Sequence, residues 1–272
     1  MEVINIIKAI MFGIVQGITE WLPISSTGHL ILLQDLLKLS LSEDFQNIFL
    51  VIIQLGSIMA VVVIFFQKLN PFTKGFKLKK DIVNLWLKII VATIPAVIVG
   101  FLFDDLIDSV LYNSVVVAIV LILYGILFIV IENKNRKPKI ENMNELDYKT
   151  AFKIGLFQML ALVPGTSRSG ATIIGAILLG TSRYTASEFS FFLAIPAMFG
   201  ASGLKLMKHG LAFSFEEWTI LLIGSVVAFL VSLYVIKYLL AYIRKHDFKI
   251  FGYYRIALGI IILLCFAISL FL

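Results

Sequence analysis

The chain has 272 residues, of which 60% are hydrophobic and only 15% are charged. Because soluble globular proteins carry roughly a quarter charged residues, this composition excludes that class and indicates an integral membrane protein. The net charge of +6 does not indicate nucleic-acid binding, because Lys and Arg fall in short clusters between apolar segments, where topology signals and lipid contacts are expected.

Six apolar segments are long enough to cross a bilayer, since a hydrocarbon core of ~30 Å requires about 20 helical residues. They are residues 48–66, 86–103, 112–131, 188–207, 217–240 and 254–272. Two other stretches are too short and are interrupted by proline: residues 8–22 end at Pro23 and are followed by 28–39, and residues 150–163 end at Pro164 and are followed by 170–180. Each pair is typical of a re-entrant helical hairpin, which enters the membrane, breaks and turns back.

The basic residues of the loops predict the orientation of these spans. The sequence places cytoplasmic loops at Lys68–Lys80, at residues 134–139 with Lys134, Arg136, Lys137 and Lys139, and at residues 241–250. The connection FDDLIDS, with Asp104, Asp105 and Asp108 and no basic residue, is predicted to be external.

The two halves of the chain share one order of elements. Residues 1–131 carry the first hairpin and three spans, residues 150–272 carry the second hairpin and three spans, and both lie in a single membrane domain over residues 1–272. Residues of the same type occur in the same order: Gly13 and Gly155, Gln16 and Gln158, Pro23 and Pro164, Ser26 and Ser167. Since three crossings are an odd number, the second half is expected upside down, as in transporter repeats. The fold class is therefore all-α, with six transmembrane helices and two re-entrant hairpins in an inverted repeat.

The first tip, residues 20–29, concentrates reactive side chains in an apolar setting. Gln16 and Glu20 lie four residues apart and therefore on one helix face. A carboxylate inside a bilayer costs at least ~2.5 kcal/mol, so Glu20 is expected to line a cavity rather than to face lipid. Beyond the break come Ser25, Ser26, Thr27 and His29. A purely structural alternative is that Glu20 braces the hairpin through hydrogen bonds.

The second tip, residues 164–172, reads PGTSRSGAT and predicts an anion site. A helix starting after a break presents free N–H groups, and Arg168 offers a planar cation that matches phosphate oxygens. The phosphate-binding candidates are Gly165, Thr166, Ser167, Ser169 and Thr172, together with Ser25 and Thr27 of the first tip. The alternative is a structural role in which Arg168 pairs with a carboxylate such as Glu20.

The two tips together contain the groups required for phosphoryl transfer, which depends mainly on positioning and charge stabilisation. Ser26 is the candidate nucleophile, His29 and Glu20 are the candidate acid and base, and Arg168 is the candidate clamp. A cavity in the middle of a membrane suits a substrate with a phosphate head and an apolar tail, such as a lipid diphosphate. The rival interpretation is a lipid or phosphate transporter or flippase built on the same inverted repeat.

The stretches QGITEWLPISSTGH, IIQLGSI, LVPGTSRSGAT and SRYTASEFSFFLAIP resemble the undecaprenyl-diphosphate phosphatase family of bacterial inner membranes, which is known for bacitracin resistance. The resemblance implies hydrolysis of undecaprenyl diphosphate by a multi-pass membrane enzyme, with Ser26, His29, Glu20 and Arg168 as site residues. It also implies a divalent cation, Mg²⁺ or Ca²⁺, held by Glu20 and Gln16. A glutamine at position 16 removes one carboxylate from the family motif, so Glu20, the diphosphate and water are expected to supply most of the metal ligands. Membrane lipid is an expected partner, nucleic acid is not, and homodimerisation is left open.

Our mechanistic hypothesis is that Ser26 attacks the terminal phosphorus, activated by His29, which Glu20 or Thr27 orients. A competing version makes His29 the nucleophile. We interpret SRYTASEFS, from Ser182 to Ser190, as a capped helix start with Arg183 on the cytoplasmic side. We expect the active site to open to the external face, from which the hairpin with Ser26 enters.

Overall fold

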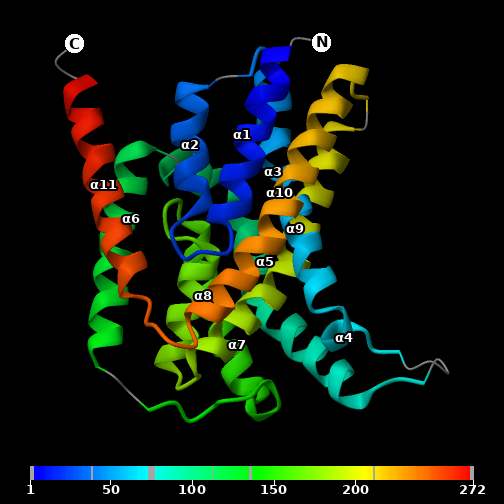
Figure 1. The fold of residues 1–272 in the computed structure, drawn as a ribbon, viewed down its shortest axis with the longest axis vertical. Coiled ribbons are helices and arrows are strands. Elements are labelled where there is room, and N and C mark those ends of the chain that lie inside the picture. Colours follow the sequence, from blue (N-terminus) through cyan, green and yellow to red (C-terminus); the bar gives the residue numbers. More distant parts are fainter. Residues whose placement is uncertain are drawn as a thin grey trace.

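The computed structural model describes residues 3–37, 39–72, 77–111, 113–134, 137–210 and 212–269, without the side chains of Asp35, residues 104–110, His209 and Ser269. Within these ranges the regular secondary structure is helical and no strand is present, which confirms the all-α class (Figure 1). Of the residues used to predict orientation, Lys74 and Arg136 and the side chains of Asp104, Asp105 and Asp108 lie outside the described part.

Six long helices confirm the six predicted spans. They are α3 (Glu43–Ile64), α5 (Lys80–Leu111), α6 (Ser114–Asn133), α9 (Arg183–His209), α10 (Phe215–Tyr242) and α11 (Lys249–Ser269), with a short α4 (Phe66–Leu69) after α3. Several helices begin before their apolar run because a polar residue caps them: Ser42, Ser182 and Ser214 each accept a hydrogen bond from a first-turn N–H.

The prediction that FDDLIDS is a connection is wrong, because α5 continues through it to Leu111. Hydropathy marks where apolar residues end, whereas acidic residues can continue a helix beyond the apolar part.

The first short helix pair consists of α1 (Val3–Thr19) and α2 (Ser26–Leu36). Figure 1 shows the chain reversing between them at mid-height of the molecule. The backbone N–H of Ser40, just after α2, donates to the Asn5 side chain at the start of α1 over 3.1 Å. The pair therefore returns to the end of the molecule where it began, as a re-entrant hairpin requires.

The second short pair consists of α7 (Tyr148–Met159), the 3₁₀ turn η2 (Leu160–Leu162) and α8 (Arg168–Leu178), preceded by the 3₁₀ turn η1 (Met143–Glu145). The segment before η1 pairs with the residues that follow α8: Lys139 N–H donates to the Gly180 carbonyl over 2.7 Å, and Ser182 N–H to that of Ile140 over 2.8 Å. This pair also returns to its starting end, which is opposite to that of the first pair (Figure 1).

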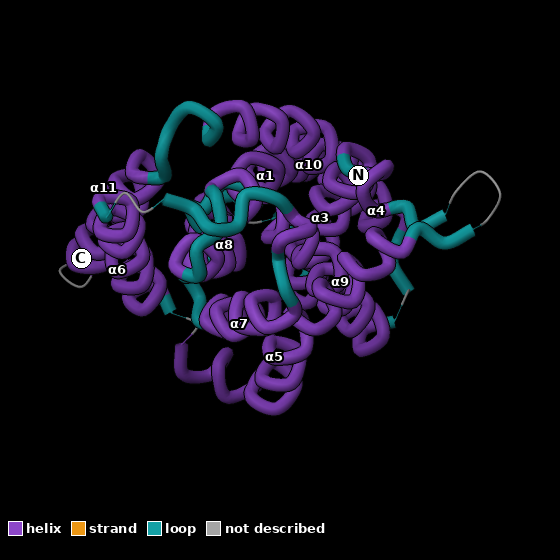
Figure 2. Tube along the Cα trace, turned by 90° about the horizontal axis from the view of Figure 1, so that it is seen from below, coloured by secondary structure: helices purple, strands orange, loops and turns teal. Residues whose placement is uncertain are grey.

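The two short pairs are packed in equivalent ways, which is compatible with the predicted inverted repeat. Helix α1 lies against α10, α7 lies against α5, and α6 pairs with α11 (Figure 2). A Cβ atom at Gly13 would lie 2.6 Å from the Gly224 carbonyl oxygen of α10, and one at Gly155 would lie 2.2 Å from the Ala92 oxygen of α5. Glycine therefore permits close helix contact at corresponding places in both halves.

Candidate active site

Both tips are closed by the same backbone device. Ser25 and Ser167 have positive φ values of 72° and 71° and immediately precede α2 and α8. Each hydroxyl accepts a hydrogen bond from the N–H three residues on, that of Gly28 or Gly170. Serine can hold this uncommon conformation because the cap compensates part of its strain.

This shared device corrects the alignment of the two halves. Ser25 corresponds to Ser167, so the residue equivalent to Ser26 is Arg168. The sequence-based pairing of Ser26 with Ser167 is wrong by one residue, because it aligned the two prolines rather than the two caps. The candidate nucleophile and the candidate clamp therefore occupy the same first helical position in the two tips.

Glu20 is the centre of the polar cluster between the tips. Its Oε2 accepts from Ser26 Oγ over 2.8 Å and from Gln16 Nε2 over 3.0 Å, and its Oε1 accepts from Arg168 Nη2 over 3.1 Å. The Glu20 side chain is 6% exposed and that of Arg168 is 13% exposed, so the ion pair is shielded from solvent. The structure brings together Gln16, Glu20, Ser26 and Arg168 and contains the predicted Arg168–Glu20 pair.

A second set of contacts fixes Arg168 and its neighbours. Arg168 Nη1 donates to the Ser190 carbonyl over 2.6 Å, and its guanidinium lies over the Trp21 ring at 5.9 Å. Thr172 Oγ1 and Ser190 Oγ share a 2.6 Å hydrogen bond, and Ser169 Oγ donates to the Glu20 carbonyl over 3.3 Å. The planar guanidinium is thus oriented by contacts with Ser190, Trp21 and Glu20.

His29 is held differently from the predicted arrangement. Its Nδ1 lies 2.7 Å from the Ser25 carbonyl oxygen and its Nε2 lies 2.6 Å from the Tyr254 hydroxyl, whose ring is parallel to the imidazole. The prediction that Glu20 or Thr27 orients His29 is therefore wrong. The i to i+4 geometry of α2 places the imidazole over the Ser25 carbonyl, and α11 supplies Tyr254. The acceptor of the Ser26 hydroxyl is Glu20.

Packing and backbone contacts explain two other predicted phosphate-binding residues, Gly165 and Thr166. Gly165 has φ 92°, and a Cβ there would lie 2.6 Å from the Val117 oxygen, so its glycine is explained by close contact with α6. Thr166 is buried, and its carbonyl is occupied by a side chain of α11. Within the described part of the chain, no hydrogen bond joins Thr27 to the Glu20 cluster.

The sequence reasoning missed Arg255 of α11. This residue is fully buried and donates to carbonyls of both tips: to Pro23 over 3.0 Å, to Gly165 over 2.7 Å and to Thr166 over 2.9 Å. The missed signal is an ionisable residue inside the predicted span 254–272, since such residues usually face a polar interior. Together with Tyr254, it attaches α11 to the two tips.

The segment SRYTASEFS has two roles. The predicted cap is confirmed, since the Ser182 hydroxyl accepts from the Thr185 N–H over 3.2 Å, and Arg183 pairs with Glu132. The structural interpretation was incomplete, however, because Ser190 contacts both Arg168 and Thr172. Two turns of helix separate the cap from this contact.

The residues around Glu20 are chemically suited to a divalent cation that takes most of its ligands from elsewhere. The described residues contain no group of three His, Cys, Asp or Glu able to hold a metal by themselves. Gln16 Oε1, however, is buried and has no hydrogen-bond partner among the described residues, while Nε2 of the same amide donates to the Glu20 carboxylate. Mg²⁺ commonly binds through one or two protein oxygens, substrate phosphates and water.

Comparison with known proteins shows the family of the chain. A family model described as bacitracin resistance protein BacA matches residues 9–261. The chain belongs to this family. It is 61% identical over 267 residues to undecaprenyl-diphosphatase 1 of Clostridioides difficile (strain 630), with 97% of each chain covered. It is also 56% identical to the undecaprenyl-diphosphatases of Desulfitobacterium hafniense (strain DSM 10664 / DCB-2) and Enterococcus faecalis, covering 98% of this chain and at least 98% of each relative. The resemblance inferred from the motifs is confirmed.

Proposed function

We propose that this protein hydrolyses undecaprenyl diphosphate to undecaprenyl phosphate and inorganic phosphate, recycling the lipid carrier for cell-wall synthesis and conferring bacitracin resistance. BacA family membership and near full-length similarity to relatives named undecaprenyl-diphosphatase support this activity. The structural observation that carries the proposed site is the convergence of Ser26 and Arg168, from separate tips, on the carboxylate of Glu20.

In the mechanism that we propose, Glu20 accepts the proton of the Ser26 hydroxyl as Oγ attacks the terminal phosphorus. The new Oγ–P bond forms while the bond from phosphorus to the bridging oxygen breaks, which releases undecaprenyl phosphate. Glu20 then gives this proton to the bridging oxygen of the departing undecaprenyl phosphate, which frees the carboxylate to deprotonate a water molecule. This water hydrolyses the phosphoserine, and the proton passes from Glu20 to Ser26 Oγ as inorganic phosphate is released. The 2.8 Å hydrogen bond between Ser26 and Glu20 supports this choice of base over His29.

Arg168 is proposed to bind the diphosphate oxygens. Its Nη atoms contact Glu20 and Ser190, and its buried Nε has no hydrogen-bond partner among the described residues, so it retains a donor for an anion. Glu20 and Gln16 would hold Mg²⁺ or Ca²⁺, whose charge would offset that of the diphosphate when bound. Ser25 and Ser167 are proposed to shape the tips through their caps, while Ser169 and Thr172 position Glu20 and Arg168.

The competing assignment of His29 as nucleophile has less geometric support, because both of its ring nitrogens are already within hydrogen-bond distance of Ser25 and Tyr254. The two versions leave different covalent intermediates. Phosphoserine survives acid, whereas phosphohistidine is labile in acid and stable in alkali.

The decisive assay is phosphate release from undecaprenyl diphosphate by the purified, detergent-solubilised protein, where no second compartment exists. We expect Ser26→Ala to lower kcat by more than about 10³-fold, as expected for loss of a nucleophile. Arg168→Ala should lose about 10²- to 10³-fold, and Arg168→Lys should not restore activity because the planar fork is lost. Ser42→Ala, which removes a helix cap outside the tips, is the matched control.

Two outcomes would contradict this account. Parent protein that releases no phosphate would contradict the enzyme assignment and favour the transporter. An active Ser26→Ala variant with an inactive His29→Ala variant would show that His29, and not Ser26, is the nucleophile.

The active centre is proposed to open to the extracytoplasmic face of a bacterial inner membrane. The hairpin with Ser26 starts and ends opposite the basic loops, and loops rich in Lys and Arg mark the cytoplasmic side. The inverted repeat and the re-entrance of both hairpins belong to the same proposal.

A further inference from the structure

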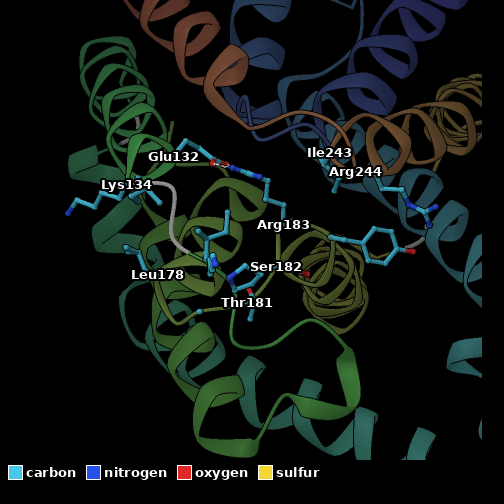
Figure 3. A pocket seen from close by; sticks show the side chains of 14 residues that line it. Glu132, Lys134, Leu178, Thr181, Ser182, Arg183, Ile243 and Arg244 are labelled. Carbon is cyan, nitrogen blue, oxygen red and sulfur yellow. Dashed lines mark hydrogen bonds and ion pairs between the residues drawn. The ribbon is translucent and has the colours of Figure 1, made fainter.

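A polar cavity lies away from the tips, at the end of the molecule that carries the basic loops. It has a volume of about 270 Å³ and is bounded by the end of α6, the end of α8, the start of α9 and the end of α10 (Figure 3). Helix α8 runs from Arg168, at the active centre, to Leu178, in the cavity wall; its eleven residues span about 15 Å. The cavity is therefore distinct from the proposed catalytic site.

The charges that line this cavity are mainly positive. Its cations are Lys134, Lys137, Arg183 and Arg244, and Glu132 is the one acidic residue among its lining residues. Glu132 is already occupied: it accepts from Arg183 Nη2 over 2.5 Å and Nε over 3.0 Å, and from the Phe248 N–H over 3.2 Å. In Figure 3, Arg183 points to Glu132, and Lys134 and Arg244 lie on opposite sides of this ion pair. An excess of positive charge therefore remains for an anion.

Hydrogen-bond donors accompany this charge. The cavity wall includes the start of the 27-residue helix α9, where the Ser182 side chain accepts a hydrogen bond from the Thr185 N–H. The N–H groups of Arg183 and Tyr184 have no acceptor within the helix. Independently, Thr181 lines the cavity and is only 4% exposed, and its Oγ1 has no hydrogen-bond partner among the described residues. A buried hydroxyl without a partner costs free energy unless a ligand or water satisfies it.

The remaining wall is apolar and lies at the end of the membrane-spanning helices. It contains Ile131, Ile177, Leu178 and Ile243, and Leu178 is 37% exposed. By the charge of its loops, this end is the predicted cytoplasmic interface, where anionic headgroups meet the protein. A site that joins cations and hydroxyls to an apolar rim suits a phosphate group attached to an acyl chain better than a phosphate free in solution.

We propose that this cavity binds the phosphate group of an anionic membrane lipid at the cytoplasmic face, separately from catalysis. Lys134, Lys137 and Arg244 supply charge, Thr181 and the start of α9 supply hydrogen bonds, and the Arg183–Glu132 pair fixes the wall. The occupant is a resident lipid of the membrane rather than the diphosphate substrate.

The test is native mass spectrometry of the full-length protein with phosphatidylglycerol, with phosphatidylcholine as the zwitterionic comparison. We expect one saturable phosphatidylglycerol adduct, weakened about tenfold in Lys134→Gln/Lys137→Gln, given the attraction of each cation to anionic lipid. The matched control, Lys79→Gln/Lys80→Gln, removes the same charge from another basic loop of the same end and should change binding by less than about threefold. Equal weakening by both pairs, or equal binding of phosphatidylcholine, would overturn the site.

Thr181→Val provides a variant that is expected to fold, because the hydroxyl that it removes has no described partner. It should leave Tm without lipid unchanged or raised and should weaken the phosphatidylglycerol adduct severalfold. Unchanged lipid binding would remove Thr181 from the site. A final arm titrates inorganic phosphate into the Arg168→Ala protein: protection of Tm that disappears in Lys134→Gln/Lys137→Gln would mean that the cavity takes free phosphate, and would overturn the assignment to lipid.

Discussion

Glu20 joins three donors that arrive from three directions: Gln16 from its own helix, Ser26 from across the first break and Arg168 from the second tip. In a shielded site, removing one member of such a group leaves a buried charge without compensation, which is costly. Function and local stability are therefore expected to depend on the same residues.

Part of this cluster could be predicted from the sequence. The spacing of Gln16 and Glu20 places them on one helix face, and an arginine in a polar break of an apolar chain requires an anionic partner. The roles of His29 and Arg255 could not be predicted in the same way, because His29 contacts Tyr254 of α11 and Arg255, also of α11, donates to both tips. His29 and Tyr254 are 225 residues apart, and Arg255 is 232 residues from Pro23 and 90 from Gly165. Contacts between residues so far apart in the sequence leave no local periodicity to detect.

Arg255 provides a prediction at the residue scale. Arg255→Met should leave the Pro23, Gly165 and Thr166 carbonyls without their donor and should lower the free energy of unfolding by about 3 kcal/mol. Arg255→Lys keeps the charge but cannot reach all three carbonyls. It should therefore recover part of the stability and a smaller part of kcat. Denaturant unfolding and phosphate release measure the two effects. If Arg255→Lys restored both fully, only the charge would matter, and the proposed linkage of the two tips would be wrong.

At the scale of elements, two short helix pairs and six long helices were predictable because apolar length and proline breaks report them directly. Helix ends were less predictable: caps extended α3 and α9 beyond their apolar runs, and α5 continued through an acidic segment. The alignment of the two tips depended on backbone conformation at Ser25 and Ser167, and residue type does not reveal a positive φ in serine.

Close helix contact gives a prediction for the α7–α5 pair. Gly155→Ala would place a Cβ atom 2.2 Å from the Ala92 carbonyl oxygen, so the helices must separate, at a cost of about 1–3 kcal/mol. Gly203→Ala is the matched control, because no atom lies within 4 Å of its Cβ position, and it should be neutral or stabilising. Thermal unfolding in detergent compares the two. Equal Tm values for both variants would show that the α7–α5 contact is not tight.

At the scale of the whole molecule, the two hairpins begin at opposite ends and meet at their tips (Figure 1). The orientation of the molecule in the membrane stays a prediction from loop charge. Which residues meet between the tips depends on the packing of α10, α5 and α11, and the sequence alone does not give that packing.

Cysteine accessibility in whole cells tests this arrangement. In a Cys265→Ser background, Ile4→Cys and Ser40→Cys should both react with a membrane-impermeant maleimide added outside, because the first hairpin returns to its starting face. Asn144→Cys, beside the second hairpin, should react only after permeabilisation. Opposite accessibility of Ile4→Cys and Ser40→Cys would mean that the first hairpin crosses the membrane, and this would exclude the re-entrant topology.

The most direct test of the central claim is an experimental structure with a non-hydrolysable methylene diphosphonate analogue of the prenyl diphosphate. Our account predicts that the terminal phosphonate lies within about 3 Å of both Ser26 Oγ and the Arg168 guanidinium, the distance of a hydrogen bond. A diphosphonate bound by one tip alone, with the other side chain turned away from it, would contradict a shared active centre.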